Sequence, residues 1–193
     1  MIGDALSRFN SDYKKRFFNF LILMVIIWIV TLVIVKMTGM EKPVLDFLKG
    51  TIGKTPNSKT NFLPLFWHNF SGALLVIIIG IIPIPLYYLA IIENALSVGL
   101  LLGVSNNPIM IFITGLLPHG IFEVPGQLIS AAISARLVWF MIDKYIRHRR
   151  VETTLKQMIT TSAVDTVVYA LPLFLIASII ETYITPILLG LTR

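Results

Sequence analysis

The feature that most constrains this chain is a long stretch that is almost free of charge. Between Thr60 and Ala135 the only Asp, Glu, Lys or Arg side chains are Glu93 and Glu123. A water-soluble domain carries about 25% charged residues, whereas this chain carries 13%, beside 56% hydrophobic residues. One bilayer crossing takes roughly 20 apolar residues, so the stretch has room for three or more. The sequence therefore predicts an all-α fold, a polytopic transmembrane helical bundle.

Proline, glycine and asparagine divide the apolar sequence into about five spans. The segment 108–141 is longer than one simple span and is interrupted by Pro118. We therefore expect a broken or re-entrant helix at 108–117, before His119, and then a longer helix kinked by Pro125. The other four spans are expected at residues 17–35, 62–82, 86–104 and 164–189.

All of residues 1–193 are expected to form a single integral membrane domain. Basic side chains favour the cytoplasmic face of a membrane, which places the N-terminal arm 1–16 and the basic segment 142–160 in the cytoplasm. Five crossings agree with that placement. The loop 36–61 is then extracytoplasmic, although it carries five lysines. We expect a multi-pass protein whose N-terminus is cytoplasmic.

Charge and cysteine content exclude several functions. The net charge of +6 is best explained by basic residues that contact anionic lipid head groups. We therefore expect the lipid bilayer as a partner and no nucleic acid. Cysteine is absent, which excludes disulfides, thiol catalysis and Cys-ligated zinc.

A face of small residues lies in the expected span 86–104. Ala95, Gly99 and Gly103 recur every four residues, a spacing that lets another helix approach closely. Packing within the chain is the favoured interpretation, and a seam of a homo-oligomer is the alternative.

The chemistry of the chain is expected among the polar residues inside its spans. Placing a carboxylate in hydrocarbon costs at least about 2.5 kcal/mol on insertion scales, so such residues usually have a function. Asp165 lies near the end of a predicted span, where we expect it to reach water, and we set it aside. The candidates are Glu93 with Asn94, His119 with Glu123, Glu181, and His68 with Asn69.

His119 and Glu123 stand at i and i+4, which places both on one face of a helix. Such a pair can share a metal ion or act as a base and its orienting partner. Gly120 leaves room beside them for a ligand, and Pro125 frees a backbone carbonyl that must be satisfied by protein or water. Glu181 is the best candidate for a third ligand. One His and two carboxylates with an open position are typical of hydrolytic zinc sites.

The same residues also have a structural interpretation. His119 and Glu123 could bind each other and Asn94 as interhelical contacts without any catalysis. In the functional interpretation, Glu93 is the next candidate for a third metal ligand after Glu181. The sequence leaves the structural and the functional interpretations open.

The segment LPHGIFEVPG at 117–126 resembles the His-Gly-x-x-Glu-x-Pro signature of the stage II sporulation protein M family. FWHNF at 66–70, ENALSVGLLLG at 93–103 and IIETYITP at 179–186 support the resemblance by their order and spacing. The resemblance covers residues from about 62 to 190. The matching positions are Asn69, Asn94, Gly103, His119, Gly120, Glu123, Pro125, Glu181 and Pro186.

The resemblance implies two contexts, both in the plasma membrane of a bacterium. The family's namesake belongs to a peptidoglycan-remodelling complex in spore formers, where it is treated as a scaffold. Relatives accompany circular bacteriocin genes, where a protein of this kind serves leader removal, ring closure or export.

Three functions follow as hypotheses. The first is an intramembrane metal-dependent peptidase or peptide-maturation enzyme that acts on membrane-embedded peptides. It would use Zn²⁺, Glu93 as a possible base, and Asn94 or Asn69 to polarise a carbonyl. The second is a non-catalytic scaffold that works with membrane-complex partners. The third is an ion-coupled transporter or an immunity protein.

Overall fold

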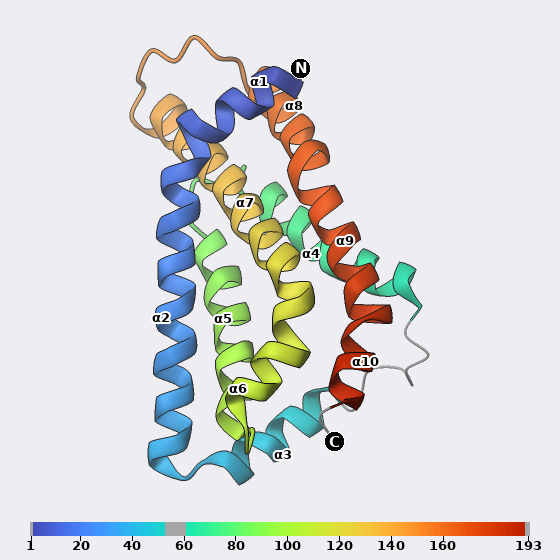
Figure 1. The fold of residues 1–193 in the computed structure, drawn as a ribbon. Helices are drawn as coiled ribbons and strands as arrows, with labels where there is room; N and C mark the ends of the chain where they lie inside the picture. Colours follow the sequence, from blue (N-terminus) through green and yellow to red (C-terminus); the bar gives the residue numbers. More distant parts are fainter. Residues whose placement is uncertain (1, 53–60, 192–193) are drawn as a thin grey trace.

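The computed structural model describes residues 2–52 and 61–191, and their regular structure is entirely helical. Five helices are long and apolar enough to cross a membrane, and they pack side by side as an elongated bundle (Figure 1). The all-α class and the number of spans predicted from the sequence are confirmed. These five helices are Gly3–Thr38, Phe62–Ile79, Tyr87–Val104, Pro108–Ile146 and Leu155–Gly190.

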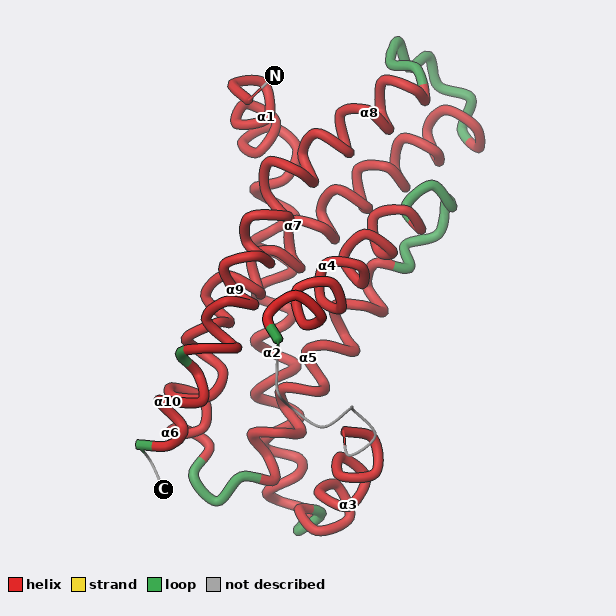
Figure 2. Tube along the Cα trace, turned by 90° about the vertical axis from the view of Figure 1, so that its right-hand side faces the viewer, coloured by secondary structure: helices red, strands yellow, loops and turns green. Residues whose placement is uncertain are grey.

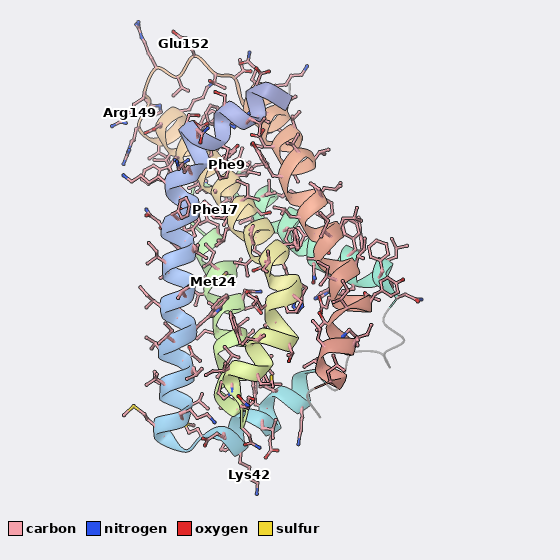
Figure 3. All side chains as sticks on the ribbon, in the orientation of Figure 1. Phe9, Phe17, Met24, Lys42, Arg149 and Glu152 are labelled. Atoms are coloured by element: carbon pink, nitrogen blue, oxygen red, sulfur yellow. The ribbon has the colours of Figure 1, made fainter. Side chains whose placement is uncertain are left out.

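The bundle is a multi-pass membrane protein with two charged ends. The N-terminus and the turn that follows the fourth span lie at one end, and the short helix α3 (Glu41–Ile52) and the C-terminal part lie at the other (Figures 1 and 2). Figure 3 shows Arg149 and Glu152 at the first end and Lys42 at the second. We call the first the N-terminal end of the bundle.

Phe62–Ile79 and Tyr87–Val104 are single α-helices, whereas the other three long helices are series of shorter elements. These three contain four π-helical turns, at Phe9–Tyr13, Phe112–Leu116, Ile142–Ile146 and Thr166–Ala170. The α-helices in chain order are α1 (Ile2–Arg8), α2 (Lys14–Thr38), α3 (Glu41–Ile52), α4 (Phe62–Ile79), α5 (Tyr87–Val104), α6 (Pro108–Ile111), α7 (Leu117–Met141), α8 (Leu155–Asp165), α9 (Leu171–Tyr183) and α10 (Thr185–Gly190).

The break predicted before His119 is a π-helical turn. Helix α6 passes through Phe112–Leu116 into α7, and Pro118 stands at the start of α7. Proline fits there because the N–H groups in the first turn of a helix have no acceptor within the helix, so no hydrogen bond is lost when proline lacks one. The backbone therefore stays helical through the whole segment while its hydrogen-bond pattern changes.

Segments that the sequence indicated as polar arms and loops contain helix. The arm 1–16 forms α1 and a π-helical turn, and its Ala5 and Tyr13 are fully buried. The loop 36–61 contains α3, while residues 53–60 lie outside the described part of the chain. The basic segment 142–160 ends in α8, so the last span begins at Leu155 and not near residue 164.

The small-residue face of α5 packs inside the chain. An added Cβ at Gly99 would lie 2.6 Å from Thr31 Cβ, and one at Gly103 would lie 2.8 Å from Val35 Cβ. Both contacts are with α2, so these glycines allow α2 and α5 to approach closely. Packing within the chain, the favoured interpretation of this face, is confirmed.

Asp165 corrects an expectation, because it is fully buried and does not reach water. Arg8 Nε donates to its Oδ2 at 2.9 Å, and the Tyr13 hydroxyl donates to the same oxygen at 2.6 Å. Arg136 Nη1 lies 3.5 Å from it and donates to the Tyr13 hydroxyl at 3.0 Å. This network ties the N-terminal segment to α7 and α8 at the N-terminal end of the bundle.

Candidate metal centre

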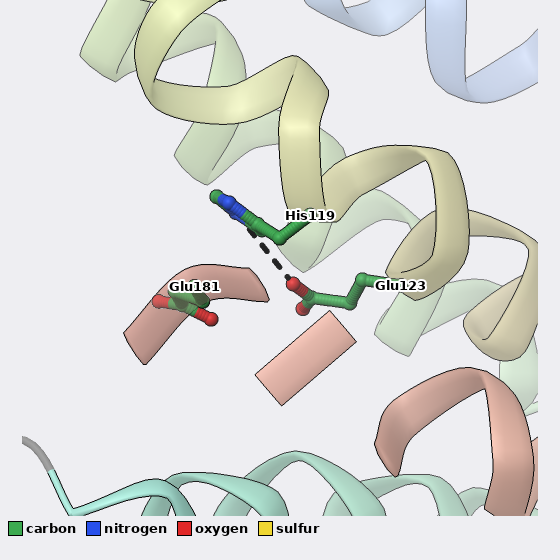
Figure 4. Close-up of side chains that lie close together, drawn as sticks. All are labelled: His119, Glu123 and Glu181. Atoms are coloured by element: carbon green, nitrogen blue, oxygen red, sulfur yellow. Dashed lines mark ion pairs between the residues drawn. The ribbon is translucent and has the colours of Figure 1, made fainter. Parts of the chain in front are cut away.

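His119 and Glu123 lie on one face of α7 and point toward each other (Figure 4). The distance from His119 Nε2 to Glu123 Oε2 is 3.8 Å, longer than a hydrogen bond. Their side chains are only 12% and 18% exposed. The predicted i, i+4 pair therefore exists, and its two facing atoms are separated by a gap.

Glu181 on α9 completes the group. One ligand atom from each of His119, Glu123 and Glu181 lies within 4.8 Å of the other two. Figure 4 shows the three side chains converging from two helices. Glu181, the candidate for a third ligand selected from the sequence, is thus brought to the pair by the packing of α9 against α7.

Two polar side chains orient the pair. A hydrogen bond of 3.3 Å joins His119 Nδ1 to the Thr185 hydroxyl, so Nε2 is the ring nitrogen that faces Glu123. Gln127 Nε2 donates to Glu123 Oε1 at 2.9 Å, which leaves Oε2 toward His119. Metal-binding histidines and carboxylates usually have outer partners of this kind, which fix their orientation.

The donor set fits a transition metal. Zinc bound at about 2.0–2.1 Å in a tetrahedron holds its ligand atoms roughly 3.3 Å apart, close to the 3.8 Å between His119 Nε2 and Glu123 Oε2. No lysine or arginine lies between Lys59 and Arg136. A bound cation would neutralise the carboxylates of Glu123 and Glu181, which have no lysine or arginine beside them among the described residues.

The centre forms one wall of a mainly apolar cavity of about 520 Å³. Asn69 from α4, Asn94 from α5 and Trp28 from α2 line it as well. The indole nitrogen of Trp28 is buried without a hydrogen-bond partner among the described residues. At Gly120 an added Cβ would meet no atom within 4 Å. The cavity thus offers apolar space with a few polar groups beside the three ligands, as ligand sites usually do.

Glu93 and His68 lie outside this cavity. Both line a neighbouring groove of about 390 Å³ between α4 and α5, which we call the α4–α5 groove. Groove and cavity share the side chains of Asn69, Asn94, Glu123 and Gln127. Glu93 therefore lines the groove alone, whereas its neighbour Asn94 lines both spaces, because neighbours on a helix point about 100° apart.

Three residues that contact the centre or line its cavity were not predicted from the sequence. Gln127 stands four residues after Glu123, and Thr185 stands four after Glu181, so helical spacing was a signal for both. Trp28 had no such signal, because an apolar span can present a tryptophan to any neighbour. Pro125 lies inside α7 on the cavity wall, and Pro186 stands in the first turn of α10.

These observations define a class: a multi-pass helical membrane protein with a polar centre between its spans. The profile of stage II sporulation protein M matches residues 16–186, and the chain belongs to that family. A distant relative is an uncharacterized protein of Methanocaldococcus jannaschii, 30% identical over 139 residues, which are 68% of this chain and 74% of that protein. No solved structure matches the chain significantly. The matched range includes every residue of the centre.

Proposed function

We propose that this chain is an intramembrane metal-dependent peptidase, or a peptide-maturation enzyme, that acts on membrane-embedded peptides. The observation that carries the proposal is the convergence of His119, Glu123 and Glu181 within 4.8 Å on the wall of an apolar cavity. A hydrophobic peptide fits such a cavity, and the polar groups beside it are those that hydrolysis of a peptide bond needs.

A metal ion, with Zn²⁺ as our choice, would supply a water of lowered pKa and polarise the carbonyl of the substrate. The chain's own residues would do the rest. Water adds to the carbonyl carbon, its proton passes to a carboxylate oxygen, and rupture of the C–N bond returns that proton to the leaving amine. Glu181 would serve both as a ligand and as the proton acceptor, through the carboxylate oxygen that the metal leaves free.

Neutral donors in the cavity would stabilise the developing oxyanion. Asn94 and Asn69 have no hydrogen-bond partner in the described part of the chain, and their amide groups line the cavity. The buried indole N–H of Trp28 is a third donor without a partner there. Donors fixed in an apolar site are worth more than donors in water, so each can contribute to the rate.

The activity test uses the purified chain in liposomes with zinc and a set of hydrophobic peptides of transmembrane length. Mass spectrometry follows cleavage or ring closure. We expect turnover by the native protein and a loss of about 100-fold or more in Glu181→Gln and His119→Ala. His148→Ala is the matched control, because His148 is exposed beyond the end of α7.

A scaffold is the second candidate, and one observation favours it. The hydrogen bonds of His119 with Thr185 and of Glu123 with Gln127 tie α7 to α10 and stiffen α7. A purely structural centre predicts that His119→Ala lowers thermal stability while the native protein takes up no zinc. It also predicts a membrane partner that co-purifies with the chain.

A further inference from the structure

The α4–α5 groove contains a carboxylate that the centre does not use. Glu93 lies on an exposed face of α5, two turns inside the span. Its side chain has no hydrogen bond or ion pair within the described residues. A carboxylate at this depth is costly unless water or a partner meets it. The groove of about 390 Å³ is where that partner would lie.

The groove offers several hydrogen-bond acceptors beside Glu93. Gln127 uses its amide nitrogen on Glu123, and its Oε1 is buried without a partner among the residues described. Asn69 and Asn94 also line the groove, and each side-chain amide carries an acceptor oxygen. His68, at the rim, is the one ring nitrogen donor of the lining. Acceptors around a carboxylate suit a ligand that carries several N–H donors and a positive charge.

The described residues that line the groove include no lysine or arginine. No lysine or arginine occurs between Lys59 and Arg136, and none occurs from residue 157 to residue 192. A second copy that presented its own α4–α5 groove would bring only His68 as a basic group. Within the described part of the chain the groove therefore has no complementary cation, and a bound molecule could bring one.

We propose that the α4–α5 groove binds a cationic group, an ammonium or guanidinium, carried by a membrane-embedded peptide. Because Glu123, Gln127, Asn69 and Asn94 border both spaces, a cation held at Glu93 places the neighbouring peptide segment at the metal centre. Glu93 would then determine specificity by selecting peptides with a basic residue or a free amine beside the reacting bond. The inference rests on the proposed function only in choosing a peptide as the carrier of the cation.

The test compares two fluorescent synthetic peptides, each a Leu/Ala helix of transmembrane length, with either lysine or norleucine at its centre. Their dissociation constants are measured for the purified full chain in detergent. We expect the lysine peptide to bind about tenfold more tightly, a difference of about 1.4 kcal/mol. The preference should disappear in Glu93→Gln, return in Glu93→Asp, and persist in His119→Ala.

Equal binding of the two peptides by the native chain would overturn the proposal, and so would a preference that survives in Glu93→Gln. Equal binding by a native dimer that Glu93→Gln separates would instead assign the groove to a second copy. Zinc content is measured on the same samples. A lysine preference in a protein that binds no zinc would contradict the proposed function and leave the cation site standing.

Discussion

The Thr185 hydroxyl lies 3.3 Å from His119 Nδ1 and joins α10 to the start of α7. Thr185 is buried, and this contact directs Nε2 of the ring toward Glu123. A residue that binds no metal itself thus fixes the orientation of one that can. Loss of such outer partners typically lowers metal affinity 10- to 100-fold.

We expect Thr185→Val to weaken zinc binding by about 10- to 100-fold while the fold is retained, since valine matches threonine in shape. Competition with a fluorescent zinc chelator measures the affinity. Thr114→Val is the control, because that hydroxyl bonds only a carbonyl of its own helix. Equal zinc affinity in the two variants would contradict a role of Thr185 in orienting His119.

The ion network at the N-terminal end makes a prediction about stability. Asp165→Asn leaves Arg8 and Arg136 without their buried carboxylate, so we expect a loss of about 3–5 kcal/mol. Thermal unfolding in detergent, followed by circular dichroism, measures the change. Asp143→Asn is the control, since Asp143 is 29% exposed and pairs with Arg147 at the surface, where a pair contributes at most about 1 kcal/mol. A similar effect in both variants would contradict the structure of this network.

The contact between α2 and α5 predicts a steric effect. Gly99→Ala places a methyl group 2.6 Å from Thr31 Cβ, and we expect a destabilisation of about 1–3 kcal/mol. Gly72→Ala on α4 is the matched control, because a Cβ there meets no atom within 4 Å and alanine favours a helix by about 1 kcal/mol. The two melting temperatures should move in opposite directions.

The orientation in the membrane can be tested directly, because the chain has no cysteine. We expect Glu152→Cys, at the N-terminal end of the bundle, to be cytoplasmic and Lys42→Cys to be outside. A membrane-impermeant maleimide applied to intact cells should label only the second variant. Labelling of the first variant alone would show that the orientation is the opposite of the one predicted.

Hydropathy and the positions of proline, glycine and asparagine were enough to predict the five spans, because every bilayer crossing must be apolar and of sufficient length. The helices in polar segments were not predicted. α3 and α8 begin among charged residues, and such residues occur equally in loops and on solvated helix faces. The capping box of Thr154 and Gln157 marks the start of α8 and was a usable signal that the prediction did not include.

The three candidate ligands could be selected from the sequence because burying a carboxylate among apolar residues is costly and usually serves a function. The same argument failed for Asp165, since a charge near the end of a span can be hydrated or paired. Its partner Arg8 lies 157 residues away in the sequence, and no local sequence pattern predicts such a contact. The separation of Glu93 from the centre likewise depends on how α4 and α5 are rotated, which spacing alone does not determine.

The measurement that tests the central claim most directly is the zinc content of the purified chain, made without chelator and then supplied with zinc. About one zinc per chain is predicted for the native protein and for His148→Ala. His119→Ala and Glu181→Gln should each lose it while remaining monodisperse and folded. A native protein that takes up no zinc, or variants that keep it, would contradict a metal centre at His119, Glu123 and Glu181.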